Sequence, residues 1–197
     1  MTNKRKLERF FKKNIIKFSH HLMDMSTELL GERLIDRLVI NSLPFNSYAI
    51  PENNPLWESA LETYTTNTNT HACYLNGADK NGCCIATNVF IFADREIKHV
   101  LGEYNNDKTQ FGGNIVNYLL FITAINFFHE VYHIADFINM TSDENIEFDN
   151  KYKTDKQFYD EVERRIETQS CKFVAEHFEE IFMGHMVGFK GVKKIDQ

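Results

Sequence analysis

The sequence predicts a mostly helical α+β fold in which a small antiparallel β-sheet precedes one long apolar helix. The run over residues 115–140 is apolar almost all round, which indicates a helix buried on most sides. Residues 72–75 and 83–92 are strand-like and are separated by two Asn-Gly pairs, so we expect a hairpin. A second helical pattern covers 158–182, where apolar residues recur at helical spacing.

Length and composition predict one globular domain spanning residues 1–197. Hydrophobic residues make up 43% of the chain, with 17 phenylalanines, which excludes an intrinsically disordered protein. The residues after Met1 lack the apolar stretch of a signal peptide, so we expect a cytoplasmic location. The four cysteines include the adjacent pair Cys83 and Cys84 but no CxxC, which fits neither a disulfide framework nor a zinc ribbon.

The chain begins with a predicted basic amphipathic helix over residues 1–19. Residues 1–17 contain seven Lys or Arg and one Glu, a net charge of +6, although the whole chain carries −6. One interpretation is a contact with nucleic acid or an anionic surface. The other is a basic helix docked on the acidic remainder of the protein. The sequence does not separate these interpretations.

The elements between this helix and the long apolar helix are short. We expect a second helix over 23–40 with Ser26 as its N-cap, a loop over 41–55, a short helix over 57–64, the hairpin, and a short helix over 95–100. Beyond the long helix, the charged residues 141–156 suggest a solvated loop. The helix over 158–182 would then end the core, leaving 183–197 as a flexible tail.

The long helix contains His129-Glu130-x-x-His133. Histidines four residues apart lie on one helical face, with about 6 Å between their Cβ atoms, so both imidazoles can hold one metal ion. Glu130 borders that face and can take a proton from a metal-bound water without being a ligand. The alternative is two core histidines satisfied by backbone carbonyls. We favour the metal, because burying these polar groups together is costly unless something satisfies them.

We do not expect a transmembrane segment. The apolar run is interrupted by Asn117, Thr123 and Asn126 and then meets His129 and Glu130. A bilayer needs about 20 consecutive apolar residues, and about 14 uncharged ones usually form a core helix.

The hairpin followed by the HExxH helix resembles the zincin superfamily of zinc metallopeptidases. The resemblance implies a bound zinc, Glu130 as general base, and an edge strand that pairs with the peptide substrate. The segment Glu167-Thr-Gln-Ser-Cys-Lys-Phe-Val-Ala is similar to the third-ligand helix of gluzincins, and most of all to ImmA/IrrE-type peptidases. It implies His129, His133 and Glu167 as zinc ligands within a catalytic core over 72–182. Cys171 and Tyr132 depart from the family pattern.

Several site assignments have alternatives. Glu163, one turn earlier, is the rival third ligand, and Asp136 either orients a ligand imidazole or is itself a ligand. His177 and Tyr159 are the main candidates for stabilising the oxyanion, and His185 and Tyr152 are further ones. Peptide deformylase, another HExxH enzyme, would instead use a cysteine ligand such as Cys83 or Cys84.

The sequence therefore predicts a zinc metallopeptidase that acts on a protein or peptide substrate. The alternative is a non-catalytic protein, of phage or effector type, that keeps the zinc site and works by contact with a partner. A weaker alternative is a nucleic-acid-binding regulator that acts through residues 1–17.

Overall fold

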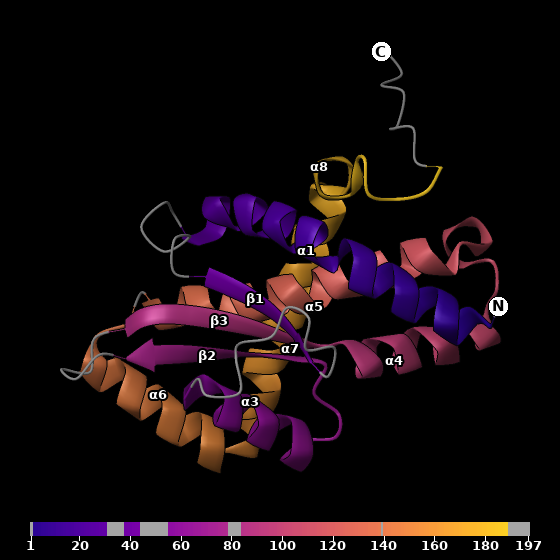
Figure 1. Ribbon diagram of the computed structural model, residues 1–197. Coiled ribbons are helices and arrows are strands. Elements are labelled where there is room, and N and C mark those ends of the chain that lie inside the picture. Colours follow the sequence, from indigo (N-terminus) through magenta and orange to yellow (C-terminus); the bar gives the residue numbers. More distant parts are fainter. Residues whose placement is uncertain (1, 31–37, 44–54, 79–83, 139, 189–197) are drawn as a thin grey trace, which may run out of the picture.

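The computed structural model describes residues 2–30, 38–43, 55–78, 84–138 and 140–188 (Figure 1). Its helices are α1 Asn3–Leu30, α3 Pro55–Thr66, α4 Ala93–Asn106, α5 Ile115–Ile138, α6 Ser142–Thr154, α7 Lys156–Glu176 and α8 Phe178–Phe182, with the 3-10 helix η1 at Gln110–Gly113. Its strands are β1 Leu38–Leu43, β2 Ala72–Ala78 and β3 Cys84–Phe92. The predicted α+β class, mostly helical with a small sheet before the HExxH helix, is confirmed.

The three strands form one sheet in the order β1-β3-β2. Strands β2 and β3 are antiparallel, with Tyr74 opposite Val89, as expected for the hairpin. The residues that join them, 79–83, lie outside the described part of the chain. Strand β1 pairs with β3 in parallel, so the prediction of a helix reaching residue 40 is wrong. The β-branched pair Val39-Ile40 favours a strand once a partner strand is available.

Helix α1 is longer than predicted, and it absorbs the start of the expected second helix. Ser26 is no N-cap, because it lies inside α1 and its Oγ donates to the Met23 carbonyl over 2.7 Å. The helix packs on α5 and α4 through a stripe that includes Leu7, Phe11 and Phe18, which are at most 2% exposed. Apolar burial therefore holds α1 on the protein.

Helix α5 is the central element, with α1, α4, α7 and the sheet packed around it (Figure 1). Phe127, Phe128 and Val131 are fully buried. Among the described residues, α5 alone is long and apolar enough to cross a membrane, with a mean hydropathy of 1.3 in its most apolar window. That window is 61% buried inside the protein, and core helices of soluble proteins pass the same test.

The segment after α5 is a helix, so the prediction of a solvated loop over 141–156 is wrong. Thr141 caps α6 in a capping box: its hydroxyl accepts from the Glu144 backbone, and the Glu144 carboxylate accepts from the Thr141 backbone over 2.7 Å. The Thr-x-x-Glu spacing that signals such a box is present in the sequence. Asp155 then caps α7, its Oδ1 accepting from the Phe158 backbone over 3.1 Å.

The predicted helix over 158–182 is divided at His177 into α7 and α8. Of the predicted tail, the structure describes 183–188, where Met186 is buried in the core, and 189–197 lie outside the described residues.

Candidate metal centre

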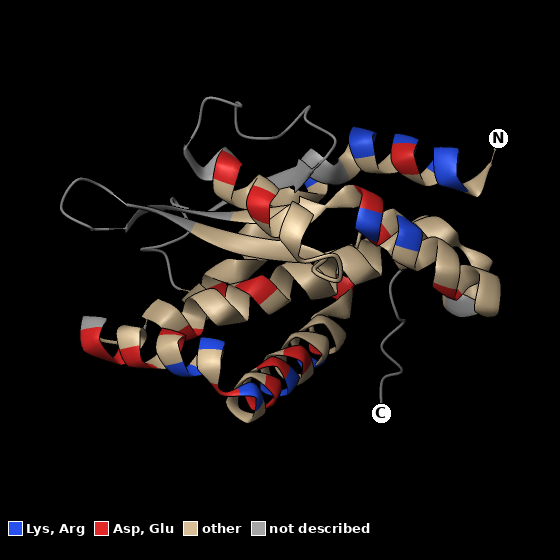
Figure 2. Cartoon of the chain, turned by 90° about the horizontal axis from the view of Figure 1, so that it is seen from below, with Lys and Arg blue, Asp and Glu red and all other residues tan. Residues whose placement is uncertain are grey.

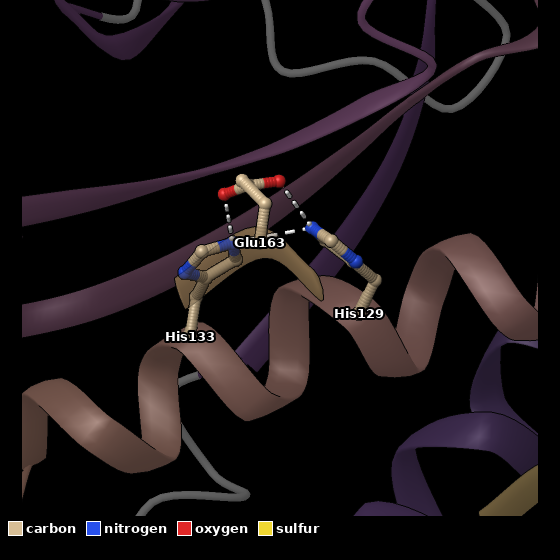
Figure 3. A group of neighbouring side chains, drawn as sticks. All are labelled: His129, His133 and Glu163. Atoms are coloured by element: carbon tan, nitrogen blue, oxygen red, sulfur yellow. Dashed lines mark hydrogen bonds and ion pairs between the residues drawn. The ribbon is translucent and has the colours of Figure 1, made fainter. Parts of the chain in front are cut away.

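Two histidines of α5 direct the same ring atom toward one point. The Nε2 atoms of His129 and His133 lie 3.2 Å apart, and the ring centroids are 4.9 Å apart (Figure 3). The side chains are largely buried, with 22% and 12% exposed. The four-residue spacing on one helical face produces this convergence, as the sequence predicted.

A carboxylate from α7 completes the group. The Glu163 oxygens face the two imidazoles, with Oε2 at 3.3 Å from His129 Nε2 and Oε1 at 3.2 Å from His133 Nε2 (Figure 3). One ligand atom from each of the three residues lies within 4.8 Å of the others. Among the described residues, this is the one His, Cys, Asp and Glu group with that geometry.

The group fits a zinc ion. Zn–N bonds of about 2.0–2.1 Å in a tetrahedron place two nitrogen ligands about 3.3 Å apart, close to the separation of the two Nε2 atoms. Two histidines and one glutamate are also the ligand set of a class of catalytic zinc sites, which keep a fourth position open. These residues can therefore hold a divalent ion between α5 and α7.

The carboxylate that meets the two histidines is Glu163, the stated alternative to Glu167 as third ligand. The structure brings Glu163 to the histidines and leaves Glu167 outside the group, exposed one turn further along α7. The packing of α7 explains the difference, because its buried stripe of Val162, Ile166 and Ser170 turns Glu163 toward α5. The helix rotates by about 40° over four residues, which carries Glu167 toward solvent.

The charges of the site are coupled. Burial raises the pKa of Glu163, but hydrogen bonds from His129, His133 and Tyr152 outweigh it and hold the pKa well below its usual range. Burial likewise lowers the pKa of His129, but Glu163 and the neighbouring carboxylates outweigh it, so the pKa is raised. In the absence of a metal, hydrogen bonds join the Glu163 carboxylate to the two imidazoles. A metal ion has to displace the protons of these hydrogen bonds in order to bind.

Glu130 lies beside the ligands and not among them. It is 8% exposed, and burial raises the pKa of its carboxyl, partly offset by His133 and His129. The backbone N–H of Tyr74 donates to this carboxylate. A buried glutamate with a raised pKa, next to a metal ligand set, is suited to exchange protons with a neighbouring water.

Strand β2 presents its free edge to the same site. Among the described strands β2 lies at the edge of the sheet, and the His71 carbonyl accepts from Phe92 of β3 over 2.8 Å. Backbone groups alternate sides along an antiparallel strand, so Ala72 and Tyr74 turn theirs away from β3. The hydrogen bond from Tyr74 to Glu130 agrees with that alternation.

The metal group lies in a cavity of about 720 Å³. Strand β2 and the residues before it form one wall, and α6 forms another, with Phe148, Asp149 and Tyr152. The guanidinium of Arg95 donates to the carbonyls of Asn67, at 2.5 Å, and Thr70, at 2.7 Å, which holds the chain that leads into β2. The cavity is large enough for several residues of a peptide.

Three of the remaining predicted site residues lie elsewhere or have other partners. Asp136 lines the cavity, but its carboxylate pairs with Arg165 of α7, so it does not serve as the expected partner of a ligand imidazole. His177 packs on Phe173 and bonds to Glu180, and the structure does not bring it to the metal group. His185 contacts Phe18 of α1. Tyr159 does line the cavity.

Tyr152 has a role that the sequence did not reveal. Its hydroxyl donates to Glu163 Oε1, and its ring centroid lies 6.2 Å from that of His133. The hydroxyl therefore fixes the orientation of a ligand carboxylate. The capping box of α6 was the sequence signal that could have predicted the helix carrying it.

We expect Tyr152→Phe to weaken zinc binding by about 10- to 100-fold, because partners that orient ligands have effects of that size. Competition with a chromophoric chelator measures the affinity. Tyr132→Phe is the matched control: its ring packs on Phe173, and it is not among the residues that line the cavity. Equal zinc affinities for Tyr152→Phe and the control would contradict this role.

A second buried acid lies next to the cavity. Glu96 of α4 is 0% exposed, and its Oε1 accepts from Asn126 Nδ2 over 2.5 Å. Asn126 lies one turn before Glu130 and lines the cavity. Burial raises the pKa of Glu96 to about 8, and the bond from Asn126 offsets this only in part.

This pKa has a consequence for stability. A carboxyl that binds its proton more tightly when folded stabilises the fold below its ordinary pKa of 4.5, and that contribution is lost as the pH rises through about 8. We therefore expect Glu96→Gln to have the same free energy of unfolding as the wild type near pH 5 and a larger one at pH 8. The difference should grow by on the order of 1 kcal/mol for each pH unit from 5 to 8. Thermal unfolding at both pH values measures this. The exposed Glu58→Gln is the control, and an equal gain at both pH values would contradict the prediction.

The deformylase alternative concerns the cysteines near the cavity. Cys83 lies outside the described residues, and of Cys84 the structure describes only the backbone, in β3. Cys73 of β2 lines the cavity but is not part of the metal group, and burial raises the pKa of its thiol well above the usual range. A buried thiol of this kind is a poor metal ligand, since the thiolate is the form that binds.

Comparison with models of known families, with curated proteins and with solved structures found no match.

Proposed function

We propose that this protein is a zinc-dependent metallopeptidase of the zincin type. The observation that carries the proposal is the group of His129, His133 and Glu163 with the buried Glu130 beside it. Metal-assisted peptide hydrolysis requires a metal ligand set and a base beside it. Here two histidines four residues apart and a carboxylate from a later helix supply the ligands, and a glutamate that is not a ligand follows the first histidine.

The substrate in this proposal is an extended peptide. Ala72 and Tyr74 turn backbone groups to the free edge of β2, where the Tyr74 N–H donates to Glu130, and both residues line the cavity that holds the metal group. A peptide added along this edge would gain main-chain hydrogen bonds, and its scissile carbonyl would lie near Glu130.

A bound zinc ion would act as a Lewis acid, polarising the scissile carbonyl and acidifying a water molecule. Glu130 would take the proton of the attacking water and deliver it to the leaving amine, so that it acts first as base and then as acid. Tyr152 is committed to Glu163, which leaves Tyr159 and Tyr74 as the phenols that line the cavity, and of these we assign Tyr159 to donate to the developing oxyanion.

The test is zinc-dependent cleavage of a mixed peptide library, with the products identified by mass spectrometry. We expect cleavage by the zinc-loaded protein, loss of cleavage after treatment with a chelator, and recovery when zinc is restored. Cleavage that survives removal of zinc would contradict the proposal. One zinc per chain with no cleavage of any peptide would favour the non-catalytic protein that acts by contact with a partner.

A further inference from the structure

The outward side of α1 is strongly basic. Viewed down the helix, six Lys and Arg residues of its first half lie within an arc of about 140°, at 100° per residue. We call this set the basic face: Arg5, Lys6, Arg9, Lys12, Lys13 and Lys17. All six side chains are exposed. Figure 2 shows blue dominating the charged residues of the helix that follows the N-terminus.

Apolar contacts hold α1 on the protein, on the side opposite the basic face. The opposite side of the helix carries Leu7, Phe11, Phe18 and Leu22, which are at most 2% exposed and belong to the main core. These contacts anchor the helix, and the six side chains of the basic face are exposed. In the described part of the chain, the contacts that anchor α1 are therefore apolar and do not depend on the charges of the basic face. An exposed cluster of like charge is costly by self-repulsion unless an anionic partner meets it.

The buried apolar side of α1 also decides between two anionic partners, a lipid membrane and a nucleic acid. A helix that lies on a membrane inserts its apolar side between the lipids, and α1 has already buried that side in the core. A phosphate backbone requires only exposed cations at the right spacing. From Arg5 to Lys17 the helix extends about 18 Å, which matches about five successive phosphates at 3.4 Å per strand of a duplex.

The mode of contact follows from the docking of α1. One side of the helix is covered by α4 and α5, so only the opposite side, which carries the basic face, can meet a duplex. It can lie across phosphates, which positions a protein without reading the base sequence. In Figure 1, α1 lies on one side of the sheet, and α3 and α6, next to the cavity, lie on the other. A duplex on α1 would leave the cavity open.

We propose that the basic face binds double-stranded DNA through its phosphates, without sequence preference. This inference does not depend on the proposed peptidase activity. The probe is a fluorescently labelled duplex of mixed sequence, and its anisotropy is followed with the zinc-loaded full chain from 50 to 200 mM NaCl. We expect binding at 50 mM that weakens with salt, with a log–log slope of about −0.9 for each phosphate contacted, and so about −4 to −5 for five contacts.

The decisive variant is Arg9→Gln/Lys13→Gln, which removes two charges from the centre of the basic face. We expect about 10-fold or more weaker binding at 50 mM and a slope reduced by about two. The matched control is Lys156→Gln/Lys172→Gln, which removes two exposed charges from α7 and should bind like the wild type. Both variants keep the apolar stripe, and thermal unfolding verifies that each is folded.

Three results would overturn the proposal. One is absence of duplex binding at 50 mM NaCl. Another is equal weakening in the α7 control, which would make the effect one of overall charge. The third is binding to vesicles of anionic phosphatidylserine but not to the duplex, which would make a membrane the partner.

Discussion

Glu130→Gln is expected to keep its zinc and to lose peptide hydrolysis by a factor of about 10² to 10⁴, the usual contribution of a positioned acid–base group. The amide matches the carboxylate in size and can still accept the N–H of Tyr74, so the cavity should keep its shape. It cannot accept the proton of the attacking water. The glutamate is not one of the three converging ligands, so metal content should not change.

The measurement combines elemental analysis with the rate of cleavage of a peptide that the wild type cuts. The exposed Glu161 of α7 supplies the control Glu161→Gln, which should match the wild type in both. Hydrolysis within about three-fold of the wild-type rate in Glu130→Gln would show that another group handles the proton, because the loss expected from general acid–base catalysis is at least about 10²-fold.

Glu163→Ala is expected to lose zinc, with affinity reduced by more than about 100-fold, because removing a ligand should exceed the loss found for the partners of ligands. Glu167→Ala is its matched comparison: the same residue type on the same helix, one turn away and exposed, which should keep one zinc per chain. Elemental analysis after dialysis separates the two. His129→Ala should lose zinc like Glu163→Ala.

The reverse pattern, with zinc kept in Glu163→Ala and lost in Glu167→Ala, would restore the ligand set implied by the gluzincin resemblance. It would also require α7 to rotate against α5 when the metal binds. Zinc kept in both variants would point to a ligand outside the three converging residues.

Several elements could be predicted because their signals are local. The hairpin follows from alternating residues around Asn-Gly turns, and α5 follows from a long and mostly apolar run. Helix α6 was missed although its signal is equally local, since Thr141 and Glu144 form a capping box that outweighs the charged composition. Strand β1 could not be predicted in the same way, because its pairing with β3 depends on residues more than 45 positions away.

The sequence by itself determined that two histidines share a helical face with a glutamate beside the first, because a spacing of four residues has only one geometric meaning on a helix. Which carboxylate meets them was decided by the tertiary structure. Glu163 and Glu167 differ by one turn, and the burial of Val162, Ile166 and Ser170 sets the rotation of α7. Tyr152 came to Glu163 in the same way, through the packing of α6 on α7. Such rotations are fixed by side-chain packing between distant segments, which no local pattern encodes.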